Sequence, residues 1–324
     1  MKFHRAFARG TRYLLARNAG LCRTYRRAKR RRIAILMYHG VTDQPLPVYN
    51  WCHMPVREFA EQMAFLAATY RPLPLSEVVQ RLAAGSPLPD LTACVTFDDG
   101  FRSNLTNALP VLKQHGIPCT VFVSTALPDT GQPPWPEQVF SAVAHSNQLS
   151  MVVGGKTFPL ASAADRLTAY YALMRVLKAL PPAEREAEQV SAFRQLGAEP
   201  ADPVFATMTW PELAEFARND LVRIGSHAHT HEILTSCTPE RQRDELARSR
   251  NILREKLGYC DVLAYPNGDH SQDIRRISRE LGYLAAVTTR HRLVSPGDDL
   301  FALDRLGIGA GWPLRNFEVK ILGY

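Results

Sequence analysis

Short apolar segments alternate with amphipathic segments along most of this chain of 324 residues, and this alternation limits the possible folds more than any other feature. Helices are predicted at residues 56–70, 76–84 (capped by Ser76), 103–115, 239–257 and 273–281, and another begins at Trp210. Strands are predicted at 33–38, 92–97, 119–124, 221–224, 262–265 and 284–288, with 70–74 and 303–308 as two further candidates. Alternating strands and helices are typical of parallel α/β proteins. Six to eight such units predict a distorted (β/α) barrel of about seven strands.

The alternation is interrupted between about residues 127 and 206. This segment begins with a proline-rich stretch, contains a potential hairpin at Gly154 and Gly155, and has a helical stretch at 163–180 that ends before Pro181 and Pro182. We therefore predict a mainly helical insertion within a barrel that spans residues 33–324.

Basic charge is concentrated at the N-terminus. The chain has a net charge of +8, but residues 1–42 hold 12 of its 39 basic residues and no acidic one, so the rest, with 27 basic and 31 acidic residues, has a net charge of −4. We interpret residues 1–32 as a basic arm. Read as a helix, it would place apolar residues on one face, as segments that contact anionic lipid do: Phe3, Phe7, Leu14, Leu21 and Tyr25. A solvated arm is the equal alternative, and no recognition motif supports nucleic-acid binding.

Neither a membrane span nor a secretory signal is expected. Charged residues interrupt every apolar stretch before it reaches about 18 residues, and Arg12 and Arg17 enclose only four apolar residues where a signal peptide needs about 7 to 15. We therefore expect the protein to be cytoplasmic or peripheral on the cytoplasmic face of a membrane. Its six cysteines include no CxxC pair and are expected to be free thiols.

Two adjacent aspartates follow the predicted strand at 92–97, in the sequence Thr96-Phe97-Asp98-Asp99-Gly100. The catalytic groups of α/β barrels lie at this end of the strands. Adjacent carboxylates point in different directions, so one can bind a metal ion while the other faces the water that the ion activates. Taken alone, Asp-Asp-Gly would favour the alternative of a cap for the following helix.

Three histidines, His227, His229 and His231, follow the predicted strand at 221–224. Because His227 and His231 are four residues apart, we expect both imidazoles on one side of a helical turn. Two imidazoles and a carboxylate are a usual ligand set for catalytic zinc, although cobalt, nickel or iron also fit. His229 lies midway between these two histidines, so its side chain should point in another direction. We expect it to lie behind the ligands or to face solvent.

Another histidine ends the first strand, in Met37-Tyr38-His39. A lone histidine here would more often be a loop residue, but it is predicted at the same face of the barrel as the two aspartates. From that place His39 could protonate a leaving group. Metal ligands, a carboxylate base and an imidazole acid together predict metal-assisted hydrolysis.

These motifs resemble those of the polysaccharide deacetylases (carbohydrate esterase family 4), and the resemblance extends from about residue 33 to 309, apart from the insertion. It implies that Asp98 is the general base and that Asp99, His227 and His231 bind the metal. Met37-Tyr38-His39 is similar to the segment that supplies the acid in the subgroup of poly-N-acetylglucosamine deacetylases. His39 is therefore the expected acid, since the family's late Leu-x-His motif is missing.

The chain departs from the family pattern at two positions. Ala228 stands where a serine or threonine is common, and Ala264 stands where an arginine would orient the base. The resemblance makes Arg305 a candidate replacement for that arginine, with a surface ion pair as the alternative. Weaker assignments are a donor to the oxyanion at Asn267, the neighbouring Tyr265, and tryptophans that stack on sugar: Trp51, Trp135 or Trp312.

The resemblance and the motifs together predict an enzyme that removes N-acetyl groups from the amino sugars of a polysaccharide or glycolipid. Its expected partners are an N-acetylated glycan or lipid-linked sugar and, through residues 1–32, an anionic membrane. One alternative is a deformylase or O-deacetylase of a lipid-linked sugar. Another is a barrel that binds carbohydrate without catalysis.

Overall fold

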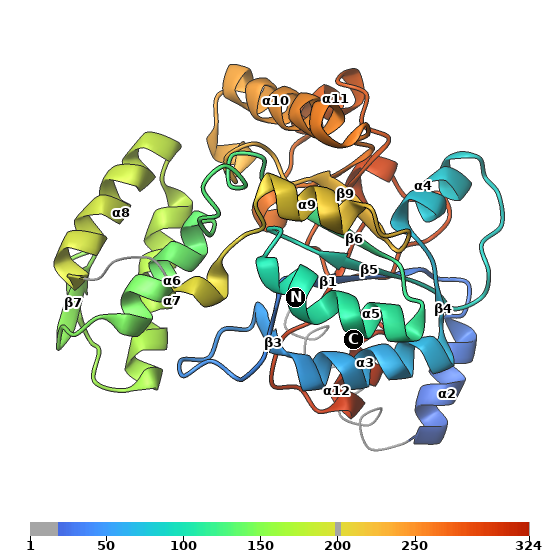
Figure 1. Cartoon of the computed structure of the whole chain (residues 1–324), viewed down its shortest axis with the longest axis horizontal. Coiled ribbons are helices and arrows are strands. Elements are labelled where there is room, and N and C mark those ends of the chain that lie inside the picture. The colour runs from blue at the N-terminus through green and yellow to red at the C-terminus, as the bar shows by residue number, and fades with distance from the viewer. Residues whose placement is uncertain (1–18, 198–201, 324) are drawn as a thin grey trace, which may run out of the picture.

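The computed structural model describes residues 19–197 and 202–323, and its centre is a curled parallel sheet (Figure 1). The predicted fold class, a distorted (β/α) barrel of about seven strands, is confirmed. Seven strands follow one another in the order β11-β10-β9-β6-β5-β1-β12, and β4 also pairs with β5. Their bounds are β1 Ala34–Tyr38, β4 Arg71–Pro72, β5 Thr92–Phe97, β6 Cys119–Val123, β9 Val222–Ser226, β10 Val262–Ala264, β11 Ala285–Val287 and β12 Leu306–Gly307.

The segment around β12 joins the two ends of the sheet. Leu303 forms a parallel bridge with Val287 in β11, and Leu306 pairs with Leu36 in β1. All residues of β1, β5 and β6 are buried, because helices cover the strands from outside, as parallel sheets require. The carboxyl ends of neighbouring strands therefore meet at one edge of the sheet.

Seven helices pack around the sheet: α3 Val56–Thr69, α4 Leu75–Ala83, α5 Leu109–His115, α9 Trp210–Ala217, α10 Pro239–Leu257, α11 Gln272–Glu280 and α12 Leu314–Lys320. Two local predictions were wrong. Ser76 does not cap α4, since the helix begins one residue earlier, after Pro74, and has no side-chain cap. The helix expected at 103–115 is divided, because a π-helical segment, Asn104–Ala108, precedes α5.

Shorter elements fill the loops at the edges of the sheet. β2 Gly40–Thr42 and β3 His53–Pro55 form a separate parallel pair that the sequence pattern did not predict. Four 3₁₀ turns follow strands or precede helices: Pro203–Phe205, Leu234–Ser236, Pro266–Gly268 and Leu300–Ala302.

Residues 127–206 contribute a small subdomain beside the barrel (Figure 1). Its elements are α6 Trp135–His145, the hairpin β7 Ser150–Val153 and β8 Lys156–Pro159, α7 Ala163–Ala179 and α8 Pro182–Leu196. The helices and the hairpin enclose an apolar core of their own, which includes Val143, Met151 and Leu173. A second cluster, with Phe101, Phe140 and Phe205, joins this subdomain to the barrel.

The described part of the N-terminal segment forms helix α2, Ala19–Ala28, which packs on the barrel. Cys22 is buried against Val319 and Leu322, and Leu21 and Tyr25 pack against the same cluster. The apolar face that was predicted to contact lipid therefore contacts protein at these two positions, because α12 offers it apolar surface. Phe3, Phe7 and Leu14 lie outside the described residues.

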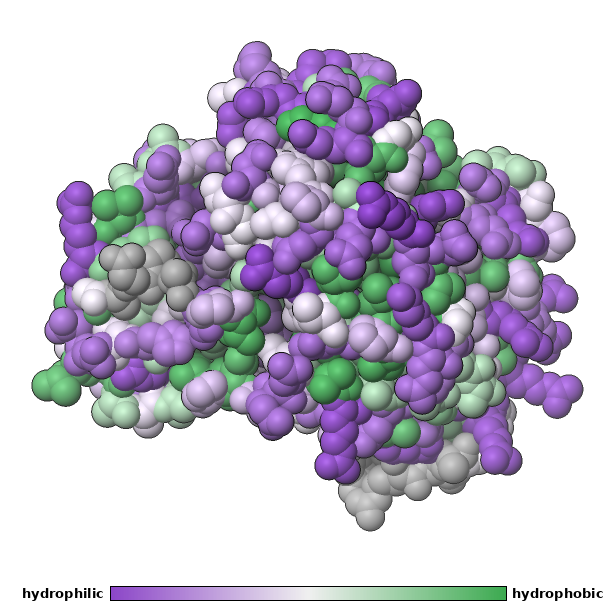
Figure 2. Space-filling view, viewed as in Figure 1, coloured by the Kyte–Doolittle hydropathy of each residue, from purple (hydrophilic) through white to green (hydrophobic). Residues whose placement is uncertain are grey.

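The remaining surface is largely hydrophilic in the view of Figure 2, above all over α10 and α11 in its upper part. Within residues 19–197 and 202–323, no helix has the length and hydropathy of a membrane span. All six cysteines are free, as expected; four are buried, and Cys52 and Cys237 are partly exposed.

Candidate functional site

A cavity of about 420 Å³ opens at the carboxyl edge of the sheet. The motif residues that follow β1, β5 and β9 line it together: His39, Asp98, Asp99, His227 and His231. Strand pairing aligns the ends of β5, β6 and β9: Phe97 pairs with Val121, and Val123 pairs with Ser226. Loops that are distant in the sequence therefore meet at this cavity. Trp51 and Asn267 also line the cavity.

Three of these side chains converge as a candidate metal centre. A carboxylate oxygen of Asp99, Oδ1, lies 3.1 Å from Nε2 of His231 and 3.5 Å from Nε2 of His227. One ligand atom from each residue lies within 4.8 Å of the other two, and all three side chains are buried. Oδ1 of Asp99 accepts no hydrogen bond of good geometry from the described residues.

The donor set fits a divalent cation. Nδ1 of His227 lies 2.8 Å from the carbonyl oxygen of Ala264, so Nδ1–H donates to that oxygen and the lone pair of Nε2 faces Asp99. Two imidazole nitrogens and one carboxylate, with the rest of the cavity open on one side, are the ligands of a catalytic ion that keeps a position for water.

The loop between His227 and His231 is not the helical turn that we predicted. Residues 227–233 have no regular secondary structure, and Ala228 and His231 have φ values of 61°. These two left-handed residues take the place of the helical turn, and the two imidazoles lie at a centroid distance of 5.0 Å. Asp99 also has a positive φ, 73°. Such conformations cost about 1–3 kcal/mol each and persist where surrounding contacts enforce them.

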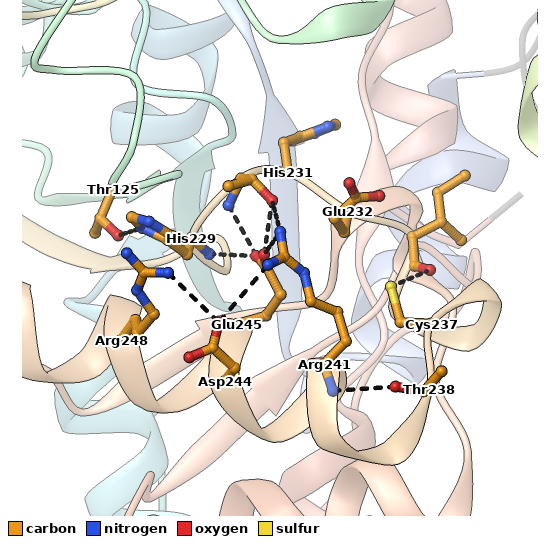
Figure 3. Close-up of polar contacts among 12 residues, drawn as sticks. Thr125, His229, His231, Glu232, Cys237, Thr238, Arg241, Asp244, Glu245 and Arg248 are labelled. Carbon is orange, nitrogen blue, oxygen red and sulfur yellow. Dashed lines mark hydrogen bonds and ion pairs between the residues drawn. The ribbon is translucent and has the colours of Figure 1, made fainter. Parts of the chain in front are cut away.

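Glu245, on α10, supplies many of the contacts that enforce this loop (Figure 3). Its fully buried carboxylate accepts hydrogen bonds from the backbone N–H groups of His229 and Thr230, at 2.9 and 2.8 Å, and from the Thr230 hydroxyl at 2.6 Å. Arg241, one helical turn earlier, forms an ion pair with it at 2.8 Å. Sequence reasoning missed Glu245, since nothing in a charged helix distinguishes the one carboxylate that faces inward.

Asp98 is held by Arg305. The guanidinium of Arg305 donates two hydrogen bonds to the Asp98 carboxylate, at 2.6 and 2.7 Å, and a third to the carbonyl oxygen of Thr288 at 2.9 Å. Arg305 is completely buried, so it is not the surface ion pair considered above. Arg305 therefore makes the contact to Asp98 that the resemblance leads us to expect of an arginine at position 264.

These contacts set the charges in the cavity. Burial raises the pKa of Asp98, but the Arg305 guanidinium outweighs it and holds this pKa below the ordinary value. Burial likewise raises the pKa of Asp99, and the two imidazoles, His231 above all, bring it below its ordinary value. Burial lowers the pKa of His227 to about 4. In His231 the neighbouring Asp99 outweighs burial and raises the pKa.

His39 lies in the same cavity, directly after β1. Its ring contacts Trp51 edge to face at a centroid distance of 5.2 Å, and its buried Nδ1 has no hydrogen-bond partner among the described residues. The backbone carbonyl of His39 accepts a hydrogen bond of 2.7 Å from Asn104, which lies in the π-helical segment. The backbone of His39 is thus anchored, and its imidazole lines the same cavity as the two aspartates.

The weaker candidates divide into two groups. Asn267, with a φ of 59°, and Trp51 line the cavity, as does Trp135. Tyr265 is buried outside the lining and donates a hydrogen bond of 3.1 Å to the carbonyl oxygen of Phe301. Trp312 is also absent from the lining, whereas His229 turns away and contacts Thr125 at 2.9 Å.

The subdomain of residues 127–206 forms one wall of the cavity and contacts the histidine loop. Trp135 donates a hydrogen bond of 3.3 Å to the carbonyl oxygen of His231, and buried Arg185 forms an ion pair with Glu232. Of the residues in this wall, only Trp135 was a candidate from the sequence. The wall consists of side chains from α6 and α7: Trp135, Pro136, Glu137, Tyr170, Met174 and Lys178.

The chain is similar to known proteins in sequence and in fold. A sequence profile described as polysaccharide deacetylase matches residues 85–151 and 184–286. The Bacillus subtilis protein YxkH, assigned by its name to the polysaccharide deacetylases, is 21% identical over 292 residues, which are 90% of this chain and 76% of that protein.

Two solved structures show the same fold. The Streptococcus pyogenes deacetylase PplD, in complex with acetate, has a TM-score of 0.63 and 19% identity, over 90% of this chain and 98% of that chain. IcaB from Ammonifex degensii has a TM-score of 0.58 and 21% identity, over 90% of this chain and 97% of that chain.

Proposed function

Because the chain belongs to the polysaccharide deacetylase family, we propose that it is a metal-dependent hydrolase that removes N-acetyl groups from the amino sugars of a polysaccharide or glycolipid. The observation that carries the proposal is the convergence of two groups of side chains in one cavity. Asp99, His227 and His231 form the candidate metal centre, and Asp98 and His39 lie beside them.

Each residue has a role that its surroundings support. A divalent cation held by Asp99, His227 and His231 would polarise the acyl carbonyl and lower the pKa of a water molecule. Asp98, ionised because Arg305 lowers its pKa, is the base that takes a proton from the attacking water. His39 is the acid that protonates the departing amine nitrogen, so acetate and a free amino sugar are released.

Arg305 and Asn267 complete the proposed mechanism. The two hydrogen bonds from Arg305 fix the direction of the Asp98 carboxylate as well as its charge. The backbone N–H of Asn267, which lines the cavity, is the proposed donor to the oxyanion that forms on the acyl oxygen. We propose zinc as the ion, because two imidazoles and one carboxylate are typical zinc ligands.

Metal analysis and acyl release test this proposal together. The purified protein should contain about one equivalent of metal after loosely bound ions are removed, and His227→Ala should contain almost none. Protein loaded with zinc or cobalt should release acetate from oligomers of N-acetylglucosamine. Release of formate from N-formyl sugars is measured in parallel. A protein that binds no metal after reconstitution would contradict the mechanism, and binding of oligomers without release would identify a non-catalytic barrel.

A further inference from the structure

We propose that Glu137 binds the sugar ring of the substrate through its hydroxyl groups and so determines which glycans this enzyme accepts. This inference rests on the proposed function. Glu137 lies in the first turn of α6, within the subdomain of residues 127–206, and lines the same cavity as Asp99 and His231. It is therefore a residue of the reaction cavity that the metal centre and the acid–base pair do not use.

The Glu137 carboxylate is buried without an adequate partner. The residue is only 4% exposed, and its side chain accepts no hydrogen bond from the described residues; the Nε2 atom of His53 lies 3.9 Å from one of its oxygens, Oε1. This distance is too long for a hydrogen bond. Buried polar groups in folded proteins are almost always hydrogen-bonded, so this carboxylate takes its donors from what occupies the cavity that it lines, either water or a bound molecule.

His53 behind it is enclosed by apolar groups. Its ring packs edge to face against Phe101 and Phe205, with centroid distances of 4.9 and 4.7 Å, and both ring nitrogens are buried without hydrogen-bond partners. A Cβ at Gly40 would lie 2.2 Å from its Nδ1, so the backbone closes that side. The Nε2 side of the ring therefore faces Glu137, with Oε1 of that carboxylate at 3.9 Å.

The surroundings of Glu137 indicate hydroxyl groups rather than a metal ion or an anion as its ligand. Among the described residues, the one metal cluster consists of Asp99, His227 and His231, so Glu137 does not share it. An anionic substituent at this position would be repelled by the Glu137 carboxylate itself, although Lys178 and Lys320 line other parts of the cavity. A neutral sugar with adjacent hydroxyls supplies two donors to one carboxylate. Tyr170 and Trp135 line the same wall and add aromatic surface beside Glu137.

The test compares Glu137→Gln and Glu137→Ala with wild type, all loaded with zinc, on an oligomer of N-acetylglucosamine. Because a variant without the carboxylate loses hydrogen bonds between substrate and a charged group, KM should rise about 10-fold to 100-fold. The rise should be larger for alanine than for glutamine, and kcat should fall much less. His53→Phe, which keeps the aromatic packing, should raise KM in the same direction by a smaller factor. Glu186→Gln, an exposed position on α8, is the matched control and should behave as wild type.

Three results would overturn the assignment. These are unchanged KM in both Glu137 variants, loss of metal from Glu137→Gln, and a fall in kcat with KM unaltered. Calorimetry with the same oligomer on proteins that carry Asp98→Asn gives Kd without turnover. If wild type binds the oligomer but releases no acyl group, the proposed function fails, while a 10-fold or greater weakening of Kd by Glu137→Gln still supports the assignment.

Discussion

Replacing Arg305 with alanine is the most informative single change in the cavity, because it removes the partner of a buried carboxylate. Asp98 is 3% exposed and receives two hydrogen bonds from Arg305. Loss of one partner of a buried ion pair typically costs about 3–5 kcal/mol of unfolding free energy. The carbonyl oxygen of Thr288 also loses its donor. We therefore expect Arg305→Ala to be destabilised by about this amount at neutral pH.

The effect should depend on pH in a defined direction. In the wild type the pKa of Asp98 is below its ordinary value, so the ion pair stabilises the fold above that value and this stabilisation is lost as the pH falls through the folded-state pKa. Without Arg305 only burial and weaker neighbours remain, and burial raises the pKa. The loss of unfolding free energy in Arg305→Ala, relative to wild type, should then become smaller as the pH falls below the raised pKa of Asp98. It should decrease by about 1.4 kcal/mol for each pH unit.

Urea denaturation of the metal-free proteins at pH 8 and pH 5.5 measures this difference. The double variant Asp98→Asn/Arg305→Ala should be less destabilised than the sum of its two single variants, because no unpaired charge remains. Arg57→Ala, at an exposed ion pair on α3, is the control and should change the unfolding free energy little. Equal destabilisation at both pH values, with additive single variants, would refute the argument that Arg305 acts by compensating the charge of Asp98.

Three further predictions concern the metal centre and the acid–base pair. Asp98→Asn should bind metal as wild type does and lose most turnover, whereas His227→Ala should lose both; elemental analysis beside an acetate assay decides, and near-normal turnover in Asp98→Asn would remove Asp98 from the base role. Glu245→Ala should weaken metal binding by about 10-fold to 100-fold, because the loop that carries the ligands loses three hydrogen bonds; competition with a chelator measures it, and unaltered affinity would contradict this positioning role. Metal binding should release protons as the pH falls, because the pKa of His231 is raised while that of His227 is about 4; calorimetry in buffers of different ionisation enthalpy counts them, and no increase in release below pH 7 would contradict the assignment of His231 as a ligand.

The barrel could be predicted because its strands are buried on both faces and so appear as continuous apolar runs. The predicted strand at 92–97 agrees with β5 at both ends, and the predicted helix at 239–257 agrees with α10. The divided helix at 103–115 could not be predicted, because hydrophobic periodicity does not distinguish a π-helical segment from an α-helical one over five residues. The short pair β2 and β3 has too few residues for a periodic signal.

The motif residues in the cavity could be predicted as a group, since each lies within a few residues of the recognisable carboxyl end of a strand. The local geometry of the histidine loop was wrong, because a spacing of four residues was interpreted as one turn of a helix. The structure instead reverses the chain with positive φ at Ala228 and His231. Positive φ is uncommon in residues other than glycine, and alanine does not favour it, so the sequence alone does not predict it. The backbone N–H groups of the loop donate hydrogen bonds to Glu245, on another element, and these contacts enforce the conformation.

Glu137 and Glu245 could not be predicted for a shared physical reason. Both are carboxylates in helices, α6 mostly apolar and α10 mostly charged, where the inward-facing position is decided by tertiary packing and not by helix propensity. A sequence indicates that a helix is amphipathic, but a buried acid on its inner face is indistinguishable from a solvated one until its donors are known. The Glu245 carboxylate finds its donors within the protein, in the backbone of the histidine loop. The Glu137 carboxylate has no hydrogen-bond donor among the described residues. By this difference, Glu245 stabilises the histidine loop, whereas Glu137 can accept hydrogen bonds from a substrate.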